Sequence, residues 1–228
     1  MSTQAPVVFG TEDLLKTLCN SVSRVLTTAT QQPIRYSGMV QKIGKTCLKP
    51  DIGCFVLFDG GFSGLVVLNF SAQAAMELYE SYMLNMGMAR EDLAVSYTSD
   101  EVSNVMGELM NQMVGDFTSR VERELQTHIT QNQPKMLVIN KQVTLSIGAN
   151  LDNPEARRVS FFTGKSNTFY LELAVDRTEF IKIADFDTEE DRDPDALFAQ
   201  AAKSGQPVQA AADGGESDNQ RLLDSLGM

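Results

Sequence analysis

Residues 100–121 read DEVSNVMGELMNQMVGDFTSRV and predict a helix with two distinct faces. At roughly 100° per residue, one face is an apolar stripe that needs a core to pack against. Its members are Val102, Met106, Leu109, Met113 and Phe117. The opposite face is polar, and its members are Asn104, Glu108, Asn111, Gly115 and Thr118.

The polar face differs from an ordinary solvated helix surface. Such surfaces usually carry Lys, Glu, Arg and Gln, which are good helix formers, whereas this one has two asparagines and a glycine around one carboxylate. A glycine inside a helix costs about 1 kcal/mol relative to alanine. A face that accepts these residues is expected to make close contact with a partner.

The rest of the chain predicts helices and strands in a clear order. Thr11 is the expected N-cap of a long amphipathic helix, and Ser71 is the expected N-cap of a second helix. Helices are expected at 11–30, 71–86 and 99–125, and strand signals at 34–43, 54–70 (turning at 59–61), 136–149 and 157–175 (turning at 164–167). Pro134 is expected to end the helical region. The pattern predicts an α+β fold with a mostly antiparallel sheet of about six strands, a long N-terminal helix and a central helical pair.

Composition and charge exclude several classes of protein. The chain has 228 residues, 43% of them apolar, and a net charge of −11. Residues from Asp185 onward carry −8 of this net charge. The chain therefore lacks the cluster of basic residues that binding to nucleic acid or to an anionic membrane surface would need. No apolar run approaches the roughly 18 residues of a membrane span, and the N-terminus does not resemble a secretory signal, so we expect a cytoplasmic protein. The cysteines, Cys19, Cys47 and Cys54, lack metal-ligand spacing and are expected to be reduced and mostly buried.

Three segments are expected along the chain. Residues 1–184 form the α+β domain, 185–217 an acidic disordered linker, and 218–228 a short docking peptide that folds on its partner. The docking residues are expected to be Leu222, Leu223, Asp224, Leu226 and Met228.

Two other motifs are set aside. Gly164-Lys165-Ser166 lacks the upstream glycine of a phosphate-binding loop and precedes a strand. His128 is the sole histidine, without a paired cysteine or a metal-binding context, and is expected to be a partly exposed residue at a helix end.

Glu108 and Asn111 stand one turn apart on the polar face. A carboxamide is neither an acid nor a base near neutral pH, but it can hydrogen-bond a water through both its C=O and its NH₂ and so direct the water's attack. Glu108 could pair with a lysine of a partner. Neither residue could perform hydrolysis alone, so the pair is expected to enter another protein's active site.

The motif resembles that of the CheC/CheX family of chemotaxis phosphatases. The shared pattern is E-x-x-N, with a polar residue four positions before it and a proline after 22 further residues, here Asn104, Glu108, Asn111 and Pro134. The resemblance is to the single-site CheX type and implies dephosphorylation of the phospho-aspartate of a CheY-type receiver domain. It implies that Asn111 orients the water, that Glu108 pairs with the receiver's lysine, and that the Mg²⁺ belongs to the receiver, with no cofactor or metal in this chain. It also implies a possible homodimer paired through the sheets.

The C-terminal sequence SDNQRLLDSLGM resembles the receiver-docking peptide of CheZ, an unrelated chemotaxis phosphatase. The leading hypothesis is therefore a receiver phosphatase with its own tether. The family usually has Asp or Ser where this chain has Asn104, and that departure fits an alternative, a CheC/CheX-like binding module without hydrolysis. A third possibility is a structural dimer, in which the polar stripe would tolerate substitution.

Overall fold

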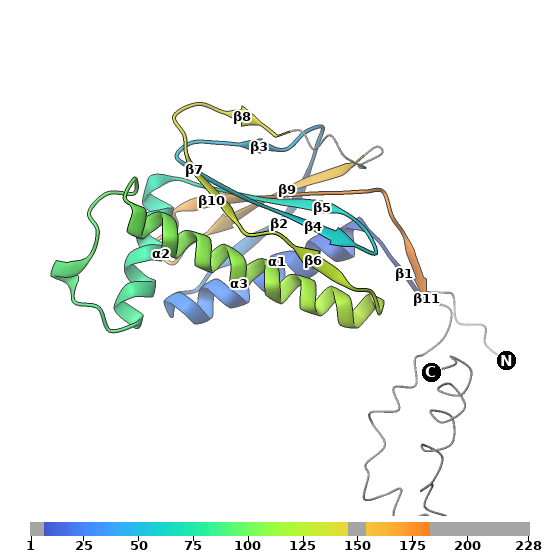
Figure 1. Cartoon of the computed structure of the whole chain (residues 1–228), viewed down its shortest axis with the longest axis horizontal. Helices are drawn as coiled ribbons and strands as arrows, with labels where there is room; N and C mark the ends of the chain where they lie inside the picture. The colour runs from blue at the N-terminus through green and yellow to red at the C-terminus, as the bar shows by residue number, and fades with distance from the viewer. Residues whose placement is uncertain (1–6, 146–153, 183–228) are drawn as a thin grey trace, which may run out of the picture. The chain divides into compact units, whose positions relative to one another are not determined.

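A computed structural model describes residues 7–145 and 154–182, which form a main antiparallel sheet with three α-helices against one face, and two smaller two-stranded sheets (Figure 1). The elements are β1 (Val7–Phe9), α1 (Thr11–Thr30), β2 (Arg35–Ile43), β3 (Cys47–Leu48), β4 (Ile52–Gly60), β5 (Gly64–Phe70), α2 (Ala72–Asn85), a 3₁₀ turn (Arg90–Asp92), α3 (Asp100–Leu125), β6 (Ile129–Gln131), β7 (Lys135–Val138), β8 (Val143–Thr144), β9 (Glu155–Phe162), β10 (Thr168–Val175) and β11 (Phe180–Lys182). The chain divides into two units, Met1–Ile183 and Ala184–Met228. The expected linker and docking peptide lie outside the described residues.

The main sheet has seven strands in the order β2-β9-β10-β5-β4-β6, and β7 also pairs with β4. Every pairing among the described strands is antiparallel, including the smaller pairs β1–β11 and β3–β8. Both expected hairpins are present, with a correction to the first turn. Residues 61–63 join β4 to β5, because Asp59 and Gly60 of the expected turn at 59–61 pair with β6 as part of β4. The expected turn at 164–167 lies between β9 and β10. The predicted α+β class is confirmed, with one more strand in the main sheet than expected.

The helix boundaries follow their capping residues, with one correction. Ser71 caps α2 as expected, because its Oγ accepts a hydrogen bond from the Ala74 N–H at 3.2 Å. For α1, however, the N-cap is Gly10 and not Thr11, which is the first helical residue and is buried. The extended backbone that an N-cap requires occurs at Gly10, whose N–H donates to the Asp13 carboxylate at 3.0 Å.

Pro134 does not end the helical region. Helix α3 stops at Leu125, where Gln126 turns into the left-handed conformation with φ of 53°. Strand β6 begins at Ile129 and pairs with β4, so Pro134 separates β6 from β7. The helix therefore ends through its own C-cap, eight residues before the proline.

The apolar stripe of α3 is buried as predicted, but the buried arc is wider. Met110, Val114 and Val121 are buried as well, because α3 packs against α1 and α2 on one side and β4, β6 and β7 on the other. Thr118, assigned above to the polar face, is only 6% exposed, and its Oγ1 donates to the Gly115 carbonyl at 3.1 Å. The polar face is thus shorter than the sequence pattern suggested.

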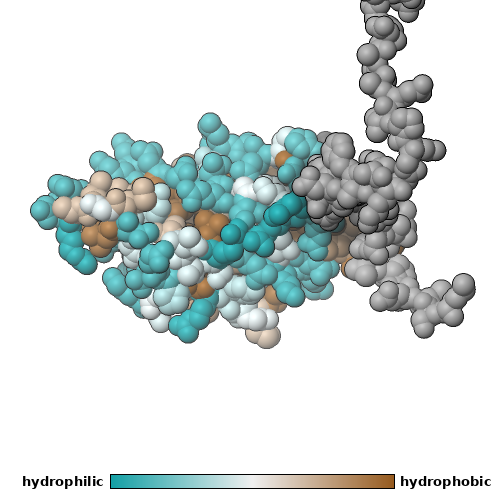
Figure 2. All heavy atoms as spheres, turned by 90° about the horizontal axis from the view of Figure 1, so that it is seen from below, coloured by the Kyte–Doolittle hydropathy of each residue, from teal (hydrophilic) through white to brown (hydrophobic). Residues whose placement is uncertain are grey.

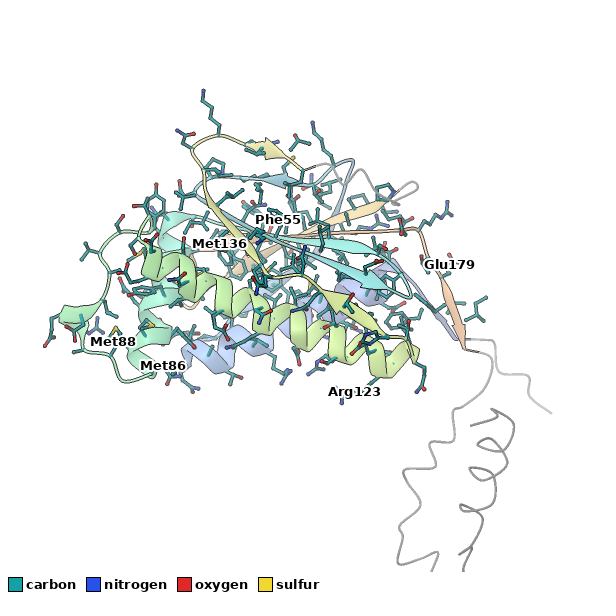
Figure 3. All side chains as sticks on the ribbon, viewed as in Figure 1. Phe55, Met86, Met88, Arg123, Met136 and Glu179 are labelled. Atoms are coloured by element: carbon teal, nitrogen blue, oxygen red, sulfur yellow. The ribbon has the colours of Figure 1, made fainter. Side chains whose placement is uncertain are left out.

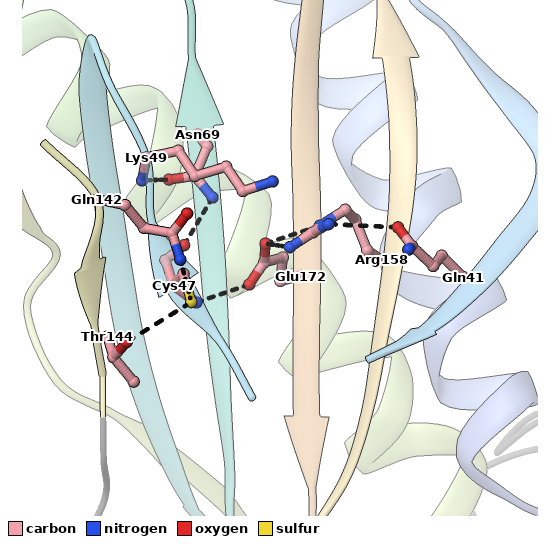
Figure 4. Close-up of polar contacts among 8 residues, drawn as sticks. All are labelled: Gln41, Cys47, Lys49, Asn69, Gln142, Thr144, Arg158 and Glu172. Carbon is pink, nitrogen blue, oxygen red and sulfur yellow. Dashed lines mark hydrogen bonds and ion pairs between the residues drawn. The ribbon is translucent and has the colours of Figure 1, made fainter. Parts of the chain in front are cut away.

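Strand β3 is held on the sheet face opposite the helices by a buried polar network (Figure 4). Glu172 is fully buried, accepts from Arg158 Nε at 2.8 Å and accepts from the Cys47 N–H at 2.9 Å. Asn69 donates to the Cys47 carbonyl at 2.9 Å and accepts from the Lys49 N–H at 2.6 Å. A short strand of two residues is thereby fixed through side chains of neighbouring long strands.

Candidate functional site

Helix α3 presents the predicted polar pair to the outside of the helical layer. Ser99 caps the helix by accepting from the Val102 N–H at 3.3 Å, and two acidic residues fill its first turn. Asn104, Glu108 and Asn111 are all exposed, while their apolar counterparts on the opposite side are buried. The core therefore orients the helix, and the helix brings the three polar side chains onto one surface.

Asn111 is held by a residue from the sheet. Its Oδ1 accepts a hydrogen bond from Gln131 Nε2 at 3.0 Å, and Gln131 is the last residue of β6. Strand β6 lies along α3 because both contact β4 and each other (Figure 1). The Asn111 carboxamide thus has a defined direction at an otherwise exposed position.

Glu108 is held from within the helix. Its Oε1 accepts from Gln112 Nε2 at 2.9 Å, an i, i+4 contact between two exposed side chains. Sequence reasoning missed both glutamines. The spacing of Gln112 from Glu108 was a readable signal, but the contact of Gln131 with Asn111 depends on how β6 packs against α3.

The two glycines of α3 have different surroundings. A Cβ at Gly107 would lie 3.7 Å from Cγ of Met136 on β7, an ordinary contact within the protein. A Cβ at Gly115 would have no atom within 4 Å, so this half-buried glycine is not required by internal packing. Open space above Gly115 is what a close approach by another molecule would need.

The surface between α2 and α3 is partly apolar. Met86 and Val95 are 67% and 97% exposed, and Met88 is also exposed, all in the segment between α2 and α3 (Figure 3). Figure 2 shows apolar atoms gathered at this end of a mostly polar face. A hollow of about 280 Å³ runs from Met86 and Tyr82 across α1 to Gln112, the residue that holds Glu108.

Asp116 links the site helix to α1. Its carboxylate pairs with Arg24 of α1 and, through Oδ2, with Arg120 at 3.0 Å. Its side chain is largely buried, whereas Arg24 is more than half exposed. The pairing keeps α1 and α3 in register beside the exposed pair.

Other reactive groups of the described residues lie elsewhere. Burial raises the pKa of the Cys19 thiol to about 12 and raises the pKa of Cys54 further, so both remain protonated. All three cysteines are free and buried, as predicted. His128 lies beyond the end of α3, highly exposed, with Nδ1 3.0 Å from Glu122. Within residues 7–145 and 154–182, no group of three or more His, Cys, Asp or Glu side chains could hold a metal ion.

The structure brings Asn104, Glu108, Asn111 and Gly115 onto one helix, and it places half-buried Pro134 after β6. The predicted docking residues of the C-terminus, Leu222, Leu223, Asp224, Leu226 and Met228, lie outside the described residues. None of the described helices is long and apolar enough to cross a membrane.

Several solved structures with a similar fold are CheX or CheC-like proteins. A CheX from Desulfovibrio desulfuricans matches with a TM-score of 0.58 and 16% identity, covering 72% of this chain and 99% of its own. A CheC-like superfamily protein from Shewanella sp. PV-4 matches with a TM-score of 0.57 and 18% identity, covering 72% and 97%. The CheX of a CheX–CheY–BeF3–Mg complex from Borrelia burgdorferi matches with a TM-score of 0.50 and 14% identity, covering 72% and 97%.

No curated relative matches the sequence. A family model described as "Protein of unknown function (DUF3334)" matches residues 5–228. The chain therefore belongs to the DUF3334 family, and its described domain has the fold of CheX and CheC-like proteins.

Proposed function

We propose that this protein is a phosphatase that dephosphorylates the phospho-aspartate of a CheY-type receiver domain. The observation that carries the proposal is the exposed pair Glu108 and Asn111, one turn apart on α3 of a CheX-like fold. The Borrelia burgdorferi structure supports the choice of partner, because there a CheX is bound to CheY.

The proposed reaction uses residues of both proteins. The Asn111 carboxamide enters the receiver's active site and hydrogen-bonds a water in line with the phosphorus. The water oxygen forms a bond to phosphorus while the bond from phosphorus to the aspartate oxygen breaks, so inorganic phosphate leaves and the receiver keeps a free aspartate carboxylate. The receiver's own Mg²⁺ stabilises charge on the phosphoryl oxygens when it is bound.

Glu108 and Gly115 have supporting roles in this proposal. Glu108 forms an ion pair with the receiver's lysine, and Gln112 keeps the carboxylate near the helix surface until then. Gly115 leaves room for the receiver's backbone to approach the helix. Residues 218–228, with Leu222, Leu223, Asp224, Leu226 and Met228, bind the receiver separately and raise its local concentration.

The test is a measurement of phosphate loss from a panel of phosphorylated receivers. We expect the wild-type chain to accelerate the decay of one receiver and Asn111→Ala to remove most of that acceleration. Asn140→Ala is the matched control, since Asn140 is an exposed asparagine in the turn between β7 and β8. Equal acceleration by wild type and Asn111→Ala would disprove the mechanism.

The second candidate is a binding module, favoured by Asn104 at the position where the CheC/CheX pattern has Asp or Ser. It predicts phosphorylation-dependent binding of a receiver without faster decay. The same assay, combined with a pull-down of the phosphorylated and unphosphorylated receivers, distinguishes the two.

A homodimer formed through the sheets is also part of the proposal. Strand β2 is at one edge of the main sheet and is largely exposed, with Met39 pointing into solvent. Sedimentation equilibrium of wild type and of Val40→Lys would measure it, with dissociation expected for the variant because a charge would be placed on a pairing edge.

A further inference from the structure

Asn111 accepts a hydrogen bond from Gln131, a residue outside helix α3. Among the hydrogen bonds of residues 7–145 and 154–182, it is the only one that joins Asn111 to another element. The donor is Gln131 Nε2 and the acceptor is Asn111 Oδ1, 3.0 Å apart. Gln131 itself is half-buried, and its Oε1 is shielded from solvent without a hydrogen-bond partner in the protein. The sheet therefore directs a polar side chain at Asn111 despite leaving one of that side chain's own atoms unpaired.

The backbone at Gln131 is firmly anchored. Gln131 lies opposite Phe58 in the β4–β6 pairing. Its neighbour Asn132 donates its N–H to the Leu57 carbonyl at 3.0 Å, and the Asn132 Oδ1 accepts from the Leu57 N–H at 3.0 Å. Because two successive residues of this strand end are bound to β4, Gln131 can serve as a rigid support for the exposed Asn111.

The burial of Gln131 also decides which end of the Asn111 amide faces outward. If the oxygen and nitrogen of both amides were exchanged, Asn111 would donate to Gln131. The Gln131 NH₂ would then be buried without an acceptor, whereas in the structure it is the Gln131 oxygen that is buried without a donor. An NH₂ has two hydrogens to satisfy, so that arrangement costs more. The favoured arrangement turns the Asn111 Oδ1 toward Gln131 and leaves its Nδ2 free to donate.

We propose that Gln131 is a positioning residue, which holds the Asn111 carboxamide with its NH₂ directed outward and one lone pair of Oδ1 left for a water. This proposal rests on the proposed phosphatase function. An asparagine held in this way needs no reorientation when the receiver arrives, so the loss of Gln131 should slow the chemical step and leave binding of the receiver unchanged.

The kinetic test uses Gln131→Met, which keeps the length of the side chain and removes the donor. Gln131→Glu is a second variant, because its carboxylate cannot donate at neutral pH and remains polar if the methionine disturbs folding. We expect kcat for receiver dephosphorylation to fall on the order of tenfold with KM unchanged. The control is Gln133→Met, at an exposed glutamine two residues along. An unchanged kcat, or a rise of KM alone, would overturn the proposal.

A double variant tests whether the effect passes through Asn111. In an Asn111→Ala background, Gln131→Met should cause no further loss of kcat, since there is no amide left to position. An additional tenfold loss in that background would show that Gln131 acts by another route and would refute its positioning role.

A measurement without a receiver separates this proposal from the proposed function. In ¹⁵N spectra, the side-chain NH₂ signals of Asn111 are identified by their loss in Asn111→Ala. We expect them to shift in Gln131→Met and to stay in place in Gln133→Met. If the signals shift but the wild-type protein has no phosphatase activity, the positioning role of Gln131 is supported and the proposed function is disproved. If the signals do not shift, the positioning role is disproved.

Discussion

Gly115 shows how one residue on α3 can be disfavoured by the helix and still be useful on its surface. Glycine is a poor helix former, and a Cβ at this position would meet no atom of the protein. The residue lies on the same face as Asn111 and Glu108, one and two turns away. At this position, helix stability favours a residue other than glycine, whereas close contact with a partner favours glycine.

Gly115→Ala is expected to stabilise the fold by about 1 kcal/mol, because it removes glycine's entropy cost without creating a clash. The same methyl group would stand where the receiver is proposed to approach, so KM for the phosphorylated receiver should rise. Urea unfolding and the phosphate assay measure the two effects separately. A stabilised variant with unchanged kinetics would mean that the receiver does not approach this part of the helix.

The buried thiols give a second prediction at this scale. A thiol reagent attacks the thiolate, and burial raises the pKa of Cys19 to about 12, so at neutral pH the native thiols should react slowly. Adding 5,5′-dithiobis(2-nitrobenzoate) should release almost no colour from the native protein and about three equivalents after unfolding, one for each cysteine. Fast release of one equivalent from native protein would contradict the described burial.

At the scale of elements, the long segments were predictable and the short strands were not. The three helices and the two hairpins have strong periodicity and marked turns, so their positions follow from local sequence. Strands β1, β3, β6 and β11 have two or three residues each and were not expected. Such short strands form because a neighbouring strand supplies their hydrogen bonds, and local propensity does not reveal that neighbour.

Helix α2 and the β9–β10 hairpin are joined by one carboxylate. Glu77 is buried and accepts hydrogen bonds from Thr163 Oγ1, from the Lys165 N–H at 2.8 Å and from Asn167 Nδ2 at 2.8 Å. This contact explains the turn at Gly164-Lys165-Ser166, which resembles the end of a phosphate-binding loop and here serves as a hairpin.

Glu77→Ala should destabilise the protein by about 3 kcal/mol, because it leaves three donors of the hairpin turn without their acceptor. Urea denaturation measures the change. Glu80→Ala on the same helix is the control, and its half-exposed side chain predicts a change below about 0.5 kcal/mol. A loss below about 1 kcal/mol in Glu77→Ala would show that the turn satisfies its donors in another way.

For the whole molecule, catalysis and recruitment are proposed to reside in different parts of the chain. The described domain offers a small polar pair, and small contacts of this kind bind weakly alone. A flexible coil with the length of the proposed linker, 185–217, would span roughly 30 Å, comparable with the roughly 35 Å diameter of a receiver domain. A receiver bound at 218–228 could then reach Asn111 at an effective concentration near the millimolar range.

Deletion of residues 218–228 is therefore expected to raise KM by at least about tenfold and to change kcat little. Steady-state phosphate release over a range of receiver concentrations measures both. The full-length variant Leu222→Ala/Leu226→Ala should reproduce the effect, and Gln220→Ala should not. An unchanged KM in the deletion variant would disprove the proposed role of 218–228 as a tether.

In the candidate site, as in the fold, some features could be predicted from the sequence and others could not. Glu108 and Asn111 were recognisable because a helix repeats every 3.6 residues, so a polar line on one face can be read directly from the sequence. Thr118 was assigned to that line wrongly, because α3 is covered on two sides and its buried arc is wider than an isolated stripe indicates. Local periodicity gives the direction of a side chain relative to its own helix and does not show what packs there.

The sequence by itself determined the α+β class, the three helices, the two hairpins and the pair Glu108 and Asn111, since each depends on residues close together in the chain. Only the tertiary structure decided that β6 lies beside α3 and that Gln131 therefore holds Asn111. It also decided that β3 is held across the sheet by Glu172 and Asn69. These contacts join residues 20 to 125 positions apart, and no local propensity or period specifies such a pairing.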